Sequence, residues 1–118
     1  MSYDRIGVIG AMDSELAALI AALTQPAQET VQGLVFHTGR LGAREVVLVR
    51  CGIGKVSAAR CTQVLIDRFA PGAVINTGIA GGLASGLAVG DIVVADGLVQ
   101  HDFDAAPIGF VRGCVCMG

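Results

Sequence analysis

The sequence predicts an α/β protein with a mixed, largely parallel sheet flanked by helices. Short runs rich in Ile and Val, such as residues 5–9 and 73–76, alternate with segments of helical periodicity. Strands that alternate with helices favour parallel pairing. Several of the apolar runs also end in glycine, as buried strands do where the backbone must stay accessible.

The first strand is expected at residues 5–9 and the first helix directly after it. Asp13 is expected to cap this helix, and Glu15 lies in its first turn. Pro26 is expected to end the helix. The apolar face follows the i, i+3, i+4, i+7 spacing of a helix that packs on a sheet, with Leu16, Leu19, Ile20 and Leu23.

Two further strands, at residues 34–38 and 45–50, are expected to form a hairpin around the turn at 39–42. A second helix begins at Gly54 and Lys55 and is stopped by the Pro-Gly pair at 71–72. Its inner face carries Ala58, Cys61, Leu65 and Phe69.

After the second helix, a strand is expected at 73–76 and a longer one at 91–100. Residues 106–110 have the composition of a loop. A length of 118 residues favours a single domain. An α/β sheet whose last strand runs into a loop lacks the helix that is expected to cover it.

The composition excludes several classes of protein. Hydrophobic residues make up 53% and charged residues 15%, with a formal net charge of −2. No basic patch with interleaved aromatics is present, which argues against nucleic-acid binding. The longest apolar run is far shorter than the ~20 residues that span a bilayer, and no signal peptide is evident, so a cytoplasmic protein is expected. The apolar excess indicates surface that a partner or further chain covers.

Metal binding has little support in the sequence. Cys51 and Cys61 lie in apolar patterns, where a buried thiol is the simpler interpretation. The pair Cys114 and Cys116 lacks a second pair of ligands at metal-binding spacing. The polar segment 101–104 is better read as a strand exit, so no metal and no cofactor are predicted.

Three strand ends are rich in glycine and polar residues, at 10–15, 52–55 and 76–82. Ligands of open α/β sheets bind at the carboxyl ends of strands, so these segments are expected to line one cleft. Glu15 is the candidate general base of that cleft, although a solvated acid at a helix N-terminus explains it equally well from the residues alone. Neither a phosphate loop nor a dinucleotide fingerprint fits residues 52–55.

The chain resembles the 5′-methylthioadenosine/S-adenosylhomocysteine nucleosidases, within the purine nucleoside phosphorylase superfamily. The matching segments occur in the family's order and cover nearly the whole chain. They are Ile6 to Met12 with Glu15, Gly52 to Val56, Ile75 to Gly82, Val89 to Val94, and His101 with Asp102.

The resemblance implies a partial nucleoside phosphorylase-like fold and hydrolysis of the N-glycosidic bond of a thio-substituted adenosine. Glu15 aligns with the acid/base residue that positions the attacking water. The residues implied to contact the purine nucleoside are Met12, Ile53, Ile79, Ala80 and Gly81. Ile108 and Phe110 align with apolar residues that reach into the neighbouring subunit's site, which implies a homodimer.

The resemblance also implies that residues 1–118 are the N-terminal part of a single nucleoside phosphorylase-like domain. The C-terminal half is then missing, because family members are much longer and carry their base-recognition residues there. The chain alone is therefore expected to bind nucleosides weakly and to turn over no substantial amount. Where phosphorylases of the superfamily use an arginine, this chain has Asn76, which favours hydrolysis over phosphorolysis. The alternatives are a non-catalytic dimerising module, a related purine nucleoside phosphorylase and a futalosine-type hydrolase.

Overall fold

The structure, a computed structural model, describes residues 4–113 and contains two compact units. The first unit runs to Gly81 and the second begins at Gly82. Each is described by itself. Among the described residues, no helix has the length and apolar character needed to cross a membrane.

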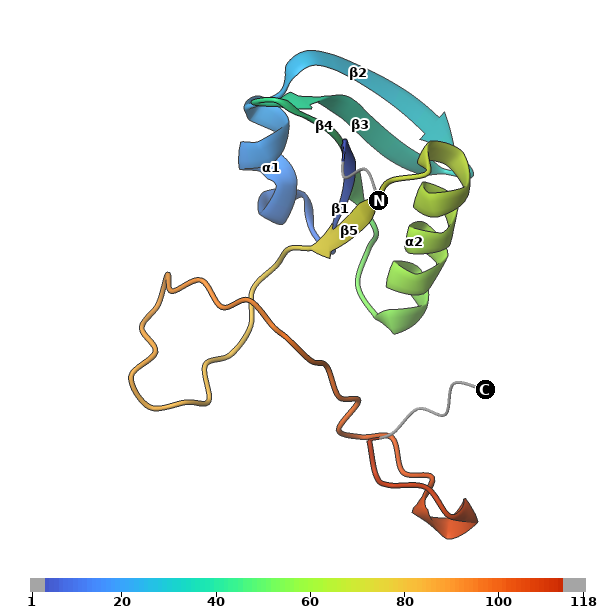
Figure 1. The fold of residues 1–118 in the computed structure, drawn as a ribbon, viewed down its shortest axis with the longest axis vertical. Helices are drawn as coiled ribbons and strands as arrows, with labels where there is room; N and C mark the ends of the chain where they lie inside the picture. The colour runs from blue at the N-terminus through green and yellow to red at the C-terminus, as the bar shows by residue number, and fades with distance from the viewer. Residues whose placement is uncertain (1–3, 114–118) are drawn as a thin grey trace. The chain divides into compact units, whose positions relative to one another are not determined.

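The first unit is built on a five-stranded mixed sheet, as the sequence predicts (Figure 1). Its strands, in the spatial order β2-β3-β4-β1-β5, are β1 (Arg5–Gly10), β2 (Thr24–Val31), β3 (Leu34–Leu41), β4 (Arg44–Arg50) and β5 (Ala73–Asn76). β1 pairs in parallel with both β4 and β5, whereas β3 is antiparallel to β2 and β4. The carboxyl ends of β4, β1 and β5 therefore share one edge of the sheet.

Two helices, α1 (Asp13–Ala21) and α2 (Lys55–Phe69), cover opposite faces of this sheet (Figure 1). The side chains of β4 show the division, because successive residues of a strand point to opposite faces. Val46 and Leu48 belong to the apolar cluster that includes Leu16 of α1. Val47 and Val49 belong to the cluster that α2 completes with Cys61, Val64, Leu65 and Phe69. The predicted inner face of α2 is confirmed.

The start of α1 differs from the prediction in one respect. Asp13 is not the cap: Met12 occupies the N-cap position with extended backbone, and Asp13 is the first helical residue. The end of the helix also comes earlier than Pro26, at Ala21. Pro26 lies instead in β2, which is an edge strand of the sheet. An edge strand tolerates proline because one side of its backbone needs no ladder partner.

The hairpin of β3 and β4 turns later than the sequence suggested. β3 continues through Leu41, so the turn falls at Gly42 and Ala43 rather than at 39–42. Gly42 has a φ of +58°, a conformation that favours glycine in a tight turn.

The second unit contains one short 3-10 helix, Ala106–Ile108, among its described residues. The strand expected at 91–100 is wrong: no residue of this segment is in a strand. A β-strand exists only when a neighbouring strand completes its hydrogen bonds, and the described residues supply no such partner to 91–100. The single-domain prediction for residues 1–118 stays a prediction.

Candidate active site

Three glycine-rich strand ends meet at the carboxyl edge of the sheet. The backbone N–H of Cys51, just after β4, donates to the carbonyl of Gly10 at the end of β1 over 2.8 Å. On the other side, the N–H of Thr77 donates to the carbonyl of Ile9 over 3.0 Å. The chain therefore leaves β4, β1 and β5 at adjacent points, as the sequence predicted.

Glu15 lies at this edge with its two carboxylate oxygens in different surroundings. Its Oε2 accepts a hydrogen bond from the backbone N–H of Met12 over 2.9 Å, while its own N–H donates to the Met12 carbonyl over 3.2 Å. Its Oε1 faces Gly78: a β-carbon built on that glycine would stand 3.0 Å away. The half-buried carboxylate is thus placed between the N-terminus of α1 and the chain just beyond β5.

The other predicted contact residues of the first unit lie in the three strand-end segments and are exposed. Met12 precedes α1 and is 37% exposed, and Ile53 in the β4–α2 loop is 79% exposed. Ile79 is 84% exposed, and Ala80 and Gly81 after it are exposed as well. Large apolar side chains exposed beside a carboxylate are typical of a ligand or partner surface.

Ile108 and Phe110 belong to the second unit, whereas Glu15 belongs to the first. Ile108 ends the short 3-10 helix and is 76% exposed, and Phe110 is 43% exposed. Their predicted role at a neighbouring subunit's site stays a prediction.

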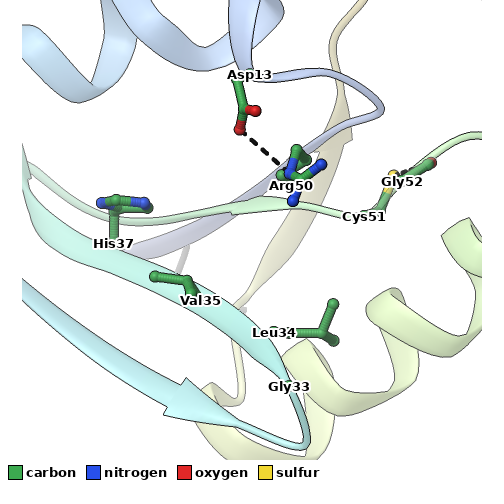
Figure 2. A pocket seen from close by; sticks show the side chains of 8 residues that line it. All are labelled: Asp13, Gly33, Leu34, Val35, His37, Arg50, Cys51 and Gly52. Atoms are coloured by element: carbon green, nitrogen blue, oxygen red, sulfur yellow. Dashed lines mark hydrogen bonds and ion pairs between the residues drawn. The ribbon is translucent and has the colours of Figure 1, made fainter.

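A separate open cleft of about 350 Å³ lies between β3 and the end of β4. Figure 2 shows its lining: Asp13, Gly33, Leu34, Val35, His37, Arg50, Cys51 and Gly52. Glu15 is not among these residues. The cleft is therefore distinct from the carboxylate that the sequence singled out.

The polar groups of this cleft are already paired with one another or with neighbours. Arg50 and Asp13 point toward each other in Figure 2, with 3.2 Å between Nε and Oδ1. A hydrogen bond of 3.1 Å joins the ring of His37 to the side-chain amide of Gln28. Asp13 therefore balances the charge of Arg50 in this cleft.

No group of three or more His, Cys, Asp or Glu side chains that could hold a metal ion occurs within residues 4–113. In the polar segment at 101–104, Asp104 accepts a hydrogen bond from the backbone N–H of Ala106 over 3.0 Å, which is a local turn contact. The pair Cys114 and Cys116 lies outside the described residues.

Sequence reasoning did not single out Gly78, which was read as one of several small residues in a glycine-rich run. The backbone N–H of Met12 was missed as well, because the residue was considered for its side chain. The signal for the Met12 N–H was present in Glu15 itself, since a glutamate at the third helical position commonly reaches back to the N–H of the N-cap residue.

The chain matches the sequence profile of the phosphorylase superfamily over residues 5–115. It is also similar to curated 5′-methylthioadenosine/S-adenosylhomocysteine nucleosidases. That of Shewanella pealeana is 45% identical over 109 residues, which are 92% of this chain and 47% of the relative. The chain thus spans about half the length of the curated relatives it matches.

Solved structures of such nucleosidases share its fold. The enzyme from Colwellia psychrerythraea, crystallised in complex with adenine, has a TM-score of 0.93 and 44% identity, covering 97% of this chain and 47% of that one. The enzyme from Neisseria meningitidis, in complex with methylthio-immucillin-A, has a TM-score of 0.90 and 38% identity, covering 95% and 48%.

Proposed function

Because the chain belongs to the phosphorylase superfamily, we propose that it is the N-terminal part of a nucleosidase. The reaction is hydrolysis of the N-glycosidic bond of 5′-methylthioadenosine or S-adenosylhomocysteine, which releases adenine and a thioribose. The relatives at 45–48% identity carry this activity in their names. A cytoplasmic location stays a prediction from the sequence.

The observation that carries the proposal is the position of Glu15. A carboxylate stands at the shared carboxyl edge of three neighbouring strands, where open α/β sheets bind ligands. One oxygen is held by the Met12 N–H at 2.9 Å, and the other faces the chain beyond β5. A glutamate that only caps the helix would make the Met12 bond as well, so the position of Oε1 beside the chain beyond β5 is what favours a role in the site.

In the proposed reaction, the bond between the ribose C1′ and the adenine nitrogen breaks, and the oxygen of water bonds to C1′. Glu15 accepts a proton from this water as general base. Its negative charge also stabilises the positive charge that develops on the sugar as the bond to adenine breaks. Protonation of the departing adenine is assigned to the part of the family fold outside this chain.

The exposed residues around Glu15 are proposed to form the nucleoside surface. Met12 would lie near the ribose, Ile53 would contact the nucleoside, and the run Ile79 to Gly81 would pass beneath it. Small residues suit this run because the backbone can approach a flat base closely. Ile108 and Phe110 are proposed to contact the alkylthio group of a second copy's substrate, which makes the active form a homodimer.

The test is to complete the chain and change one atom of the carboxylate. Residues 1–113 are fused to the C-terminal half of the Shewanella pealeana relative, and adenine release from methylthioadenosine is measured. Glu15→Gln keeps the side-chain size but removes the charge and the basic oxygen. Loss of a general base costs about 10²–10⁴ in rate, and we expect a loss of kcat in that range.

Asp13→Asn is the matched control, because it makes the same charge change two residues away in the same helix turn. The Asp13 carboxylate is 86% exposed and pairs with Arg50, so we expect activity to be kept. Equal activity of the Glu15→Gln fusion and its parent would reject the catalytic role and leave the dimerising module as the better account. Dependence of adenine release on added phosphate would instead indicate a phosphorylase.

A further inference from the structure

We infer that Gly78 is a positioning residue for Glu15: its missing side chain leaves the room in which the catalytic carboxylate stands. This inference rests on the proposed function and extends it to a residue that lies against the general base Glu15 rather than against the substrate. It also assigns different tasks to the two carboxylate oxygens.

The evidence is the surroundings of the position that a β-carbon would occupy at Gly78. Its three nearest atoms all belong to the Glu15 carboxyl group, with Oε1 at 3.0 Å, Cδ at 3.5 Å and Oε2 at 3.8 Å. Gly78 is not among the residues with positive φ, so its backbone conformation is open to alanine. The contact with Glu15, not the backbone, is what requires glycine here.

Other glycines show that this proximity is not a general property of the glycine-rich stretch. A β-carbon on Gly81, three residues later, would meet no atom within 4 Å. The same holds for Gly97 in the second unit, which also lacks a positive φ. Gly97→Ala is therefore a matched control for the chemical change from glycine to alanine.

The two carboxylate oxygens are restrained from different directions. The Met12 N–H holds Oε2 at 2.9 Å, which fixes the plane of the carboxylate. Oε1 stands against the Gly78 backbone and is the oxygen left to accept the proton of water. A methyl group at 3.0 Å is closer than ordinary contact, so the carboxylate must move by a few tenths of an ångström.

We expect Gly78→Ala in the fused enzyme to lower kcat about tenfold with little change in KM, because small misplacements of a catalytic group cost rate rather than substrate binding. Steady-state adenine release over a range of methylthioadenosine concentrations gives the two constants. In the 118-residue chain, where the β-carbon position of Gly97 is open, Gly97→Ala should leave Tm unchanged.

A structural measurement on the 118-residue chain tests the cause. Amide hydrogen exchange by NMR should become faster at Met12 in Gly78→Ala, because the displaced carboxylate weakens the bond to Oε2. Any drop in Tm caused by Gly78→Ala should disappear in the Glu15→Ala background, where the contact no longer exists.

Three outcomes would overturn the inference. The first is an unchanged kcat in Gly78→Ala. The second is a fall in kcat that comes with a rise in KM and a fall in Tm. The third is a drop in Tm that persists without the Glu15 carboxylate. The first of these, combined with a large loss in Glu15→Gln, removes the role of Gly78 and leaves the proposed function standing. Full activity in both variants rejects the proposed function itself.

Discussion

Cys61 lies fully buried on the inner face of α2. Burial raises the pKa of its thiol from 9.0 to about 11, with nearby Cys51 adding to the rise and Arg60 opposing it. The folded chain thus keeps a proton that the unfolded chain loses above pH 9. We expect the free energy of unfolding to fall by about 2 kcal/mol as the pH rises from 9 to 11, since each pKa unit is worth ~1.4 kcal/mol.

Urea unfolding under reducing conditions between pH 8 and 11 measures this loss. Cys61→Ala is less stable at every pH but should lack this part of the pH dependence. Identical pH profiles of the two proteins would show that another group titrates. The thiol should also resist alkylation at pH 8 in the folded chain, because the thiolate is the reactive form.

At the level of residues, the part of the candidate site that strand ends define was predictable from the sequence. The three glycine-rich segments converge because parallel strands place their carboxyl ends at one edge of a sheet, so the neighbourhood of Glu15 follows from the sequence pattern. The contact between Glu15 and Gly78 does not follow, because it depends on how far the first turn of α1 leans over β5. A one-dimensional pattern contains no such distance.

At the scale of elements, Gly7 of β1 determines how closely α2 packs on the sheet. A β-carbon there would stand 2.6 Å from Cδ2 of the fully buried Leu65. Gly7→Ala therefore overpacks the core, and we expect a loss of about 1–3 kcal/mol in unfolding free energy, measured by urea denaturation. Gly97→Ala, with no neighbour in reach, should cause no loss.

The pair of Gly7 and Leu65 can be tested as a unit. In the Leu65→Ala background the added methyl group has room, so the further cost of Gly7→Ala should largely disappear. Additive costs of the two changes would show that the close approach of α2 to β1 is not what requires glycine at position 7.

Elements with strong apolar patterns were predictable, and those defined by their neighbours were not. β1, β4, β5 and α2 have the Ile/Val runs or helical spacing that the sequence shows directly. β2 was missed because its segment, residues 24–31, is mostly polar and contains Pro26. Proline is tolerated in an edge strand, but its presence does not predict a strand. The segment 91–100 has a strand-like composition, yet composition does not reveal whether a partner strand exists.

At the scale of the whole molecule, the chain spans about half the length of its curated relatives, which bears on how much of its apolar surface is exposed. The second unit is correspondingly poor in buried residues, with Ala105 as the buried hydrophobic among those described. Ile92, Val93 and Val94 are 92%, 68% and 89% exposed. Apolar side chains exposed in such a run are typical of a surface that further protein covers.

This exposure predicts how the chain responds to completion by a C-terminal half. In the 118-residue chain, amides of 91–100 should exchange with solvent within the dead time of the experiment, because the structure gives them no strand partner. Amides of β4, whose residues 46–49 are all buried, should exchange slowest. The chain alone should release no measurable adenine.

Fusion to the relative's C-terminal half should slow exchange across 91–100 and create adenine release together, since both depend on the same added protein. Hydrogen–deuterium exchange with mass spectrometry, run on the chain and on the fusion, compares the two directly. Measurable turnover by the chain alone would show that adenine release does not need a C-terminal half. An active fusion in which 91–100 still exchanges freely would show that the added half does not cover these apolar residues.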